Sequence, residues 1–161
     1  MRKHQKGFSL IELLIVVAII LIIAAIAIPN LLRSRMAANE ASAVGSIRTI
    51  NTAEVTFSTT YPSIGFSPTL AALGGAAPCT TATSTSACLI DDVLSTQGVK
   101  SGYTFTAAGV AGAGGINVTY TTTAVPSVVG QSGQRGFYSD QSGVIRYDPT
   151  GAAPTASSAA L

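Results

Sequence analysis

The chain has 161 residues, which is enough for one modest domain and an anchoring segment. Hydrophobic residues make up 47% of the chain and charged residues only 10%, well below the quarter that is typical of soluble domains. The net charge is +2, and the sequence has no basic run of the kind found in nucleic-acid-binding proteins, so no nucleic-acid site is expected.

Most of the apolar excess lies in one segment near the N-terminus. No charged side chain occurs between Leu13 and Leu32, and these 20 residues in a helix span about 30 Å, the thickness of a bilayer's hydrocarbon core. The run is longer than the apolar region of about 7–15 residues of an ordinary secretory signal peptide. Because basic residues precede it, we predict a single membrane-spanning helix with its N-terminus in the cytoplasm.

One carboxylate, Glu12, stands at the start of this run. An unpaired charge in a membrane segment costs several kcal/mol, so an ordinary membrane anchor leaves this residue unexplained. A cut between Gly7 and Phe8 would create an α-ammonium group one helical turn before Glu12. The two charges could pair within one chain or between two packed copies, and pairing between copies would also set the axial stagger of the subunits.

The stretch KGFSLIELL, followed by an apolar helix that carries Pro29, resembles the N-terminal signature of type IV pilins and type II secretion pseudopilins. The resemblance implies that a prepilin peptidase cuts between Gly7 and Phe8 and that the new amino group of Phe8 is N-methylated. It also implies that Glu12 neutralises the N-terminus of a neighbour in a homo-oligomeric filament, assembled on an inner-membrane platform. Residues 1–7 are then a cleaved leader, and residues 8–32 are the transmembrane and filament-core helix.

Residues 33–61 are predicted to continue as the periplasmic half of the same helix, ending before Pro62. Glu40 and Glu54 fall near an apolar stripe on this half and interrupt it. Pro29 is expected to kink the helix, because proline lacks a backbone N–H. The stripe is expected to pack on a globular head and consists of Met36, Ala43, Ile47, Ile50, Phe57 and Tyr61.

Residues 62–101 are predicted to form a connecting loop, which contains the two cysteines of the chain, Cys79 and Cys88. Two thiols lack the further ligands that a metal needs, and the one histidine, His4, lies in the leader, so neither a metal nor a cofactor is expected. Because the resemblance places the head in an oxidising compartment, we predict a Cys79–Cys88 disulfide, worth about 2–3 kcal/mol by the chain-entropy argument.

The last third of the chain has the alternation of strands. Residues 102–150 are predicted to form an antiparallel sheet of about four strands, with a tight turn over residues 140–143. The small residues of 151–161 are predicted to form a flexible tail. The fold class is therefore α+β and type IV pilin-like: a long N-terminal helix, membrane-spanning in its first half, packed on an antiparallel sheet.

The sequence contains no Ser-His or Cys-His constellation outside the leader and no phosphate-binding loop, so an enzyme is not expected. We predict a structural subunit of a type IV pilus that serves adhesion, surface motility or DNA uptake. It would reside in the inner membrane before assembly and in a cell-surface pilus afterwards. A pseudopilin of type II secretion is the alternative, disfavoured by the lack of a dense acidic cluster near the C-terminus. A membrane-anchored binding module is a third possibility.

Overall fold

The computed structural model describes residues 8–75 and 77–161, so the predicted leader, Gly7 included, lies outside the described residues. The chain divides into two compact units, Met1–Arg35 and Met36–Leu161. Helix α1, Leu10–Thr60, contributes its first part to the N-terminal unit and its second part to the C-terminal unit. The C-terminal unit is called the head below.

Helix α1 has helical backbone throughout Leu10–Thr60, across both Pro29 and Gly45. It ends at Thr60, two residues before Pro62, as predicted. Pro29 has no N–H to donate to the carbonyl of Ala25, one turn earlier, so the ladder of helical hydrogen bonds is missing one member there. A kink at Pro29 stays a prediction.

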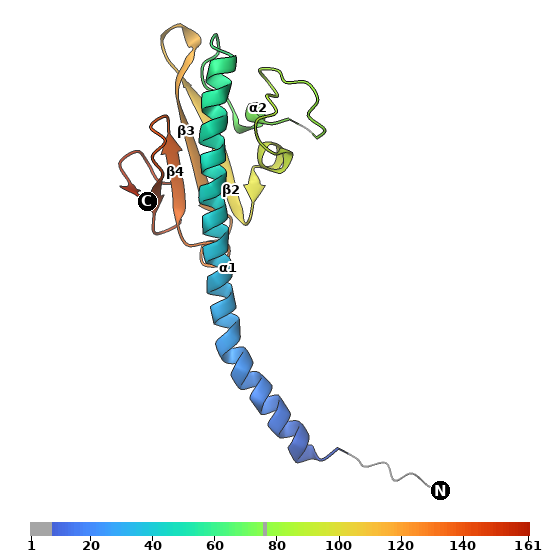
Figure 1. Ribbon diagram of the computed structural model, residues 1–161. Helices are drawn as coiled ribbons and strands as arrows, with labels where there is room; N and C mark the ends of the chain where they lie inside the picture. Colours follow the sequence, from blue (N-terminus) through green and yellow to red (C-terminus); the bar gives the residue numbers. More distant parts are fainter. Residues whose placement is uncertain (1–7, 76) are drawn as a thin grey trace. The chain divides into compact units, whose positions relative to one another are not determined.

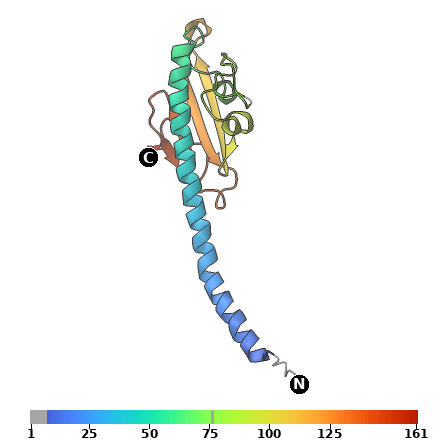
Figure 2. The same ribbon diagram turned by 45° about the vertical axis from the view of Figure 1, so that its right-hand side comes forward.

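The second part of α1 packs its predicted stripe into the head. Ala43, Ile47, Ile50 and Phe57 are fully buried, and their spacing of three, four and seven residues keeps them on one side of the helix. The Phe57 ring contacts the partly buried ring of Tyr61, with ring centroids 4.8 Å apart. Figure 2 shows the long strands β2 (Tyr103–Ala111) and β3 (Asn117–Pro126) alongside this part of the helix.

The head contains a six-stranded antiparallel sheet in which each strand pairs with the next in the sequence. About four strands were predicted. The difference arises because two strands of two residues each, β1 and β6, extend the edges of the sheet. The strands besides β2 and β3 are β1 (Val99–Lys100), β4 (Gly136–Asp140), β5 (Arg146–Asp148) and β6 (Ala159–Ala160).

One face of the sheet meets α1 and carries large side chains. Tyr103 and Phe105 of β2 are buried, as are Tyr120 of β3 and Phe137 of β4, whereas the residues between them in the strands are mostly more exposed. A one-turn 3-10 helix, η2 (Ala113–Gly115), joins β2 to β3. The predicted turn between β4 and β5 is present, because the Gly143 N–H donates to the Asp140 carbonyl at 2.9 Å.

Residues 62–101 hold more regular structure than the predicted loop. They contain a short helix, α2 (Leu70–Leu73), a π-helical turn, η1 (Val93–Gln97), and strand β1. Leu73 and Leu94 join the buried core, which explains why this segment is held against the sheet. In Figure 1 the segment with α2 lies on one side of the second part of α1, and the C-terminal strands lie on the other.

The C-terminal residues differ from the predicted flexible tail. Strand β6 pairs with β5, and Gly151 and Pro154 are buried. The tail runs against Gly136 of β4, where a Cβ atom would come within 2.0 Å of the Ala152 carbonyl oxygen. The tail can pack here because Gly136 has no side chain in the way. The small residues of 151–161 gave no sign of this contact.

Candidate functional site

The predicted assembly residues stand at the start of α1. Ser9 precedes the first helical residue, and its backbone N–H donates to Glu12 Oε2 at 2.9 Å. A glutamate three residues after a serine at a helix start is one half of a capping box, and its charge also favours the positive end of the helix dipole. Glu12 therefore caps its own helix. The S-x-x-E spacing is a sequence signal for this role that the sequence analysis missed.

Phe8 and the residues that follow it expose an apolar surface. Every large hydrophobic side chain from Phe8 to Leu32 keeps at least 45% of its surface exposed, and Phe8 itself keeps 81%. The most apolar 18-residue window of α1 has a mean hydropathy of 3.3, and none of it is buried in the described structure. By length and composition, this part of the helix can cross a membrane.

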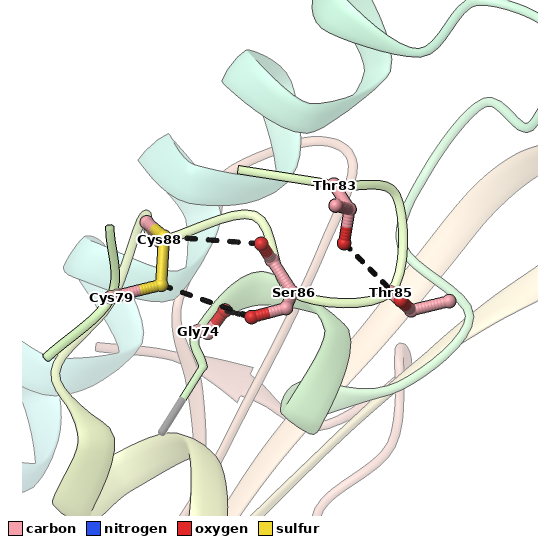
Figure 3. Close-up of a disulfide and its surroundings, with 6 residues drawn as sticks. All are labelled: Gly74, Cys79, Thr83, Thr85, Ser86 and Cys88. Atoms are coloured by element: carbon pink, nitrogen blue, oxygen red, sulfur yellow. Dashed lines mark hydrogen bonds between the residues drawn. A yellow bond between two sulfur atoms is a disulfide. The ribbon is translucent and has the colours of Figure 1, made fainter. Parts of the chain in front are cut away.

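The disulfide predicted between Cys79 and Cys88 is confirmed, with the two Cα atoms 5.7 Å apart (Figure 3). Backbone hydrogen bonds tie the segment around it to α2 and to the residue that follows α2, with the Leu89 N–H donating to the Leu73 carbonyl at 2.7 Å and the Cys88 N–H to the Gly74 carbonyl at 3.0 Å. The Ser86 hydroxyl donates to the same carbonyl at 3.2 Å. The disulfide therefore closes a loop whose Cys88 end is hydrogen-bonded to α2 and Gly74 of the head.

Glu40 joins α1 to the segment before β4. One carboxylate oxygen accepts from the backbone N–H groups of Gln134 and Arg135 at 2.9 and 3.1 Å, and the other accepts from Arg135 Nε at 2.9 Å. Burial opposes ionisation of Glu40, but these donors and the arginine charge outweigh it and hold the pKa of the carboxyl below its ordinary value. We call this arrangement the Glu40 clasp.

The guanidinium of Arg135 also lies over two aromatic rings of the head. Its central carbon is 5.5 Å from the ring centroid of Phe137 and 5.6 Å from that of Tyr147. Both distances fall within the range of a cation–π contact. The arginine of the clasp is therefore oriented by the sheet as well as by the helix.

Glu54 is the second buried carboxyl on α1, and its setting is different. It is fully buried, and Oε2 accepts from the Ser67 N–H at 2.8 Å. Burial raises the pKa of Glu54 to about 7, although the Ser67 hydrogen bond works in the opposite direction. In the sequence, Glu40 and Glu54 only interrupted the apolar stripe. They lie 14 residues apart, about four helical turns, which is the signal that places both on the buried side.

No group of three or more His, Cys, Asp or Glu side chains capable of holding a metal occurs within residues 8–75 and 77–161. Asp91 pairs with Lys100 at 2.7 Å, and the Asp140 and Asp148 carboxylates accept hydrogen bonds from Ser142 and Thr150 in turns.

Comparison with known proteins bears on the N-terminal segment. A family model described as the prokaryotic N-terminal methylation motif matches residues 2–28. The predicted resemblance to the type IV pilin family is thereby confirmed for this N-terminal segment. The matched residues contain Gly7, Phe8 and Glu12 and most of the exposed apolar surface described above.

Two curated members of the type IV pilin family are similar to the chain over short stretches. The type IV wide pilus major component PilA4 of Thermus thermophilus is 63% identical over 38 residues, which are 24% of this chain and 29% of that protein. The type IV major pilin protein PilA of Myxococcus xanthus is 44% identical over 54 residues, 34% of this chain and 24% of that protein. The similarity thus spans under a third of either relative. No solved structure matches the chain significantly.

Proposed function

We propose that the chain is the structural subunit of a type IV pilus, without catalytic activity, and that its copies assemble into a helical filament. The observation that carries the proposal is the exposed apolar surface from Phe8 to Leu32. An exposed apolar patch of this extent needs either lipid or neighbouring copies around it. A helix that first lies in a bilayer and then packs against its copies meets this need at each stage.

The processing and the assembly role of the first residues are part of the proposal. A prepilin peptidase cuts between Gly7 and Phe8, and the new amino group of Phe8 is N-methylated. Glu12 caps its own helix through Oε2, which leaves Oε1 available to accept from the ammonium group of a neighbouring subunit. Pairing between copies lowers the free-energy cost of burying both charges, and this happens only in the filament. The pairing therefore favours incorporation in the correct register.

The orientation and the partners follow from the same segment. The chain crosses the inner membrane once with its N-terminus in the cytoplasm, and the head with its Cys79–Cys88 disulfide lies on the oxidising side. An inner-membrane platform assembles the subunits into a surface filament that serves adhesion, motility or DNA uptake. A pilin is favoured over a secretion pseudopilin because both relatives reported above are named as major pilus components.

Replacement of Glu12 in cells that lack the wild-type subunit tests this proposal. Glu12→Gln keeps an oxygen for the Ser9 N–H but removes the charge, whereas Glu12→Ala removes both. We expect both variants to insert in the membrane and to be cleaved, yet to be lost from surface filaments. Asp92→Asn, which removes an exposed charge in the head, is the matched control and should assemble normally.

Normal filaments from Glu12→Gln would contradict the charge-pairing role. Loss from filaments in Glu12→Ala alone would assign the residue to helix capping. If deletion of the chain abolishes export of soluble proteins and leaves surface filaments unchanged, the pseudopilin function replaces the pilin function.

A further inference from the structure

Glu54 is a buried acid that the assembly function does not use. Its side chain is fully buried, and its one hydrogen bond is accepted by Oε2 from the Ser67 N–H. Oε1 is buried and has no hydrogen-bond partner among the described residues. The two salt bridges found in the described part of the chain, Lys100–Asp91 and Arg135–Glu40, do not involve it.

The surroundings of Glu54 offer acceptors and negative charge. Asn51, one turn earlier on α1, donates from Nδ2 to the Ser139 hydroxyl at 2.8 Å, and its Oδ1 is buried with no partner in the residues that the structure describes. The sheet adds two further ionisable groups, Tyr120 of β3 and Asp140 of β4. The charges of Glu54 and Asp140 both act on the Tyr120 hydroxyl. Burial is the main cause that raises the pKa of Tyr120 to about 12, and the negative charges of Glu54 and Asp140 raise it further.

A negative charge on Glu54 would therefore meet one backbone N–H and no cation in the described structure. An uncompensated buried charge costs several kcal/mol, and proteins commonly avoid the cost by keeping the group protonated. Because Oε2 already accepts from Ser67, the proton belongs on Oε1. Asn51 Oδ1 and Glu54 Oε1 are both buried acceptors without a partner in the described structure, and a proton on Oε1 turns one of them into a donor.

We propose that Glu54 is a proton-binding switch, buried as the neutral acid between α1, the Ser67 loop and β3, whose deprotonation as the pH rises loosens these three elements from one another. The proposal concerns the head alone and does not depend on the filament function. It gives the head a stability that responds to the pH of its surroundings.

The direction of the pH effect on stability follows from the linkage between proton binding and folding. Burial raises the pKa of Glu54 from an ordinary 4.5 in the unfolded chain to about 7 in the folded head. An acid that binds its proton more tightly when folded contributes stability that is complete below pH 4.5, declines between pH 4.5 and 7, and is gone above pH 7. The pKa difference of about 2.5 corresponds to a loss of roughly 300-fold in the folding equilibrium constant over the full range, and of roughly 70-fold between pH 5 and 8.

A direct test uses the scarcity of glutamate in this chain. The full chain in detergent micelles, labelled with ¹³C at the glutamate side-chain carboxyl, gives only three signals, from Glu12, Glu40 and Glu54. We expect one signal to titrate with a midpoint near pH 7 and to disappear in Glu54→Gln. If all three midpoints lie below about pH 5, the proposal is overturned.

Urea unfolding of the full chain in micelles at pH 5 and pH 8 provides the second measurement. Glu54→Gln keeps the shape and supplies a donor without a charge, so groups common to both chains cancel in the comparison. We expect the wild type to lose roughly 70-fold more of its folding equilibrium constant than the variant between these pH values. Equal pH dependence of the two would overturn the proposal. Glu54→Met replaces the glutamine variant if that variant does not fold.

Discussion

Removal of the Glu40 carboxylate should weaken the attachment of α1 to the segment before β4. Glu40→Ala deletes three hydrogen bonds, two from backbone N–H groups and one from Arg135 Nε. Breaking a buried ion pair from one side costs about 3–5 kcal/mol. The Glu40 side chain is 11% exposed and that of Arg135 is 40% exposed, so the lower end applies, about 3 kcal/mol or roughly 150-fold in the folding equilibrium constant.

Urea unfolding of the full chain in micelles measures this loss, with the near-ultraviolet circular dichroism of the five tyrosines as the signal. That signal reports the head, since all five tyrosines lie in residues 36–161. Glu40→Gln keeps an acceptor for the backbone N–H groups and should cost about half as much. Asp92→Ala, an exposed acid, is the control and should change stability by less than about 0.5 kcal/mol. If Glu40→Ala unfolds within that margin of the wild type, the clasp does not hold the helix.

The clasp should also respond to pH in the sense opposite to Glu54. The pKa of Glu40 is lowered in the folded head, so its stabilisation is present above the ordinary value of 4.5 and is lost as the pH falls through the folded value. The Glu40→Gln variant should therefore lose less stability on acidification below pH 4.5 than the wild type. Equal losses in the two proteins would contradict the assignment of a charged carboxylate to the clasp.

Two further predictions concern the core and the disulfide. Replacement of both Cys79 and Cys88 by serine should cost about 2–3 kcal/mol in the same urea assay, because the disulfide restricts a short loop in the unfolded chain; an unchanged midpoint would show that the loop adds no stability. Phe57→Ala should cost about 3–5 kcal/mol, because the ring is fully buried between α1 and the sheet, and a loss below about 1 kcal/mol would place the ring outside the core.

The sequence predicted the elements whose signals are local. The apolar run gave the helix, the positions of Ile47, Ile50 and Phe57 gave its buried side, and the alternation around Tyr103 and Phe105 gave a strand. Each of these depends on a period that the chain repeats several times.

The features that the sequence did not predict depend on contacts between distant residues. Strand β6 exists because the tail meets β5, and its two alanines carry no strand signal of their own. Glu40 and Glu54 were recognised only as flaws in the stripe, because their partners, Arg135 and Ser67, lie 95 and 13 residues away along the chain. The capping role of Glu12 was local and could have been predicted from Ser9.

Mass spectrometry of filaments sheared from the cell surface shows whether the chain is a processed subunit of a surface pilus. We expect a subunit that begins at N-methylated Phe8 and is two hydrogens lighter than the reduced chain, because Cys79 and Cys88 are joined. A chain that retains the residues before Phe8 in every fraction, or a processed chain that never occurs in surface filaments, would contradict it.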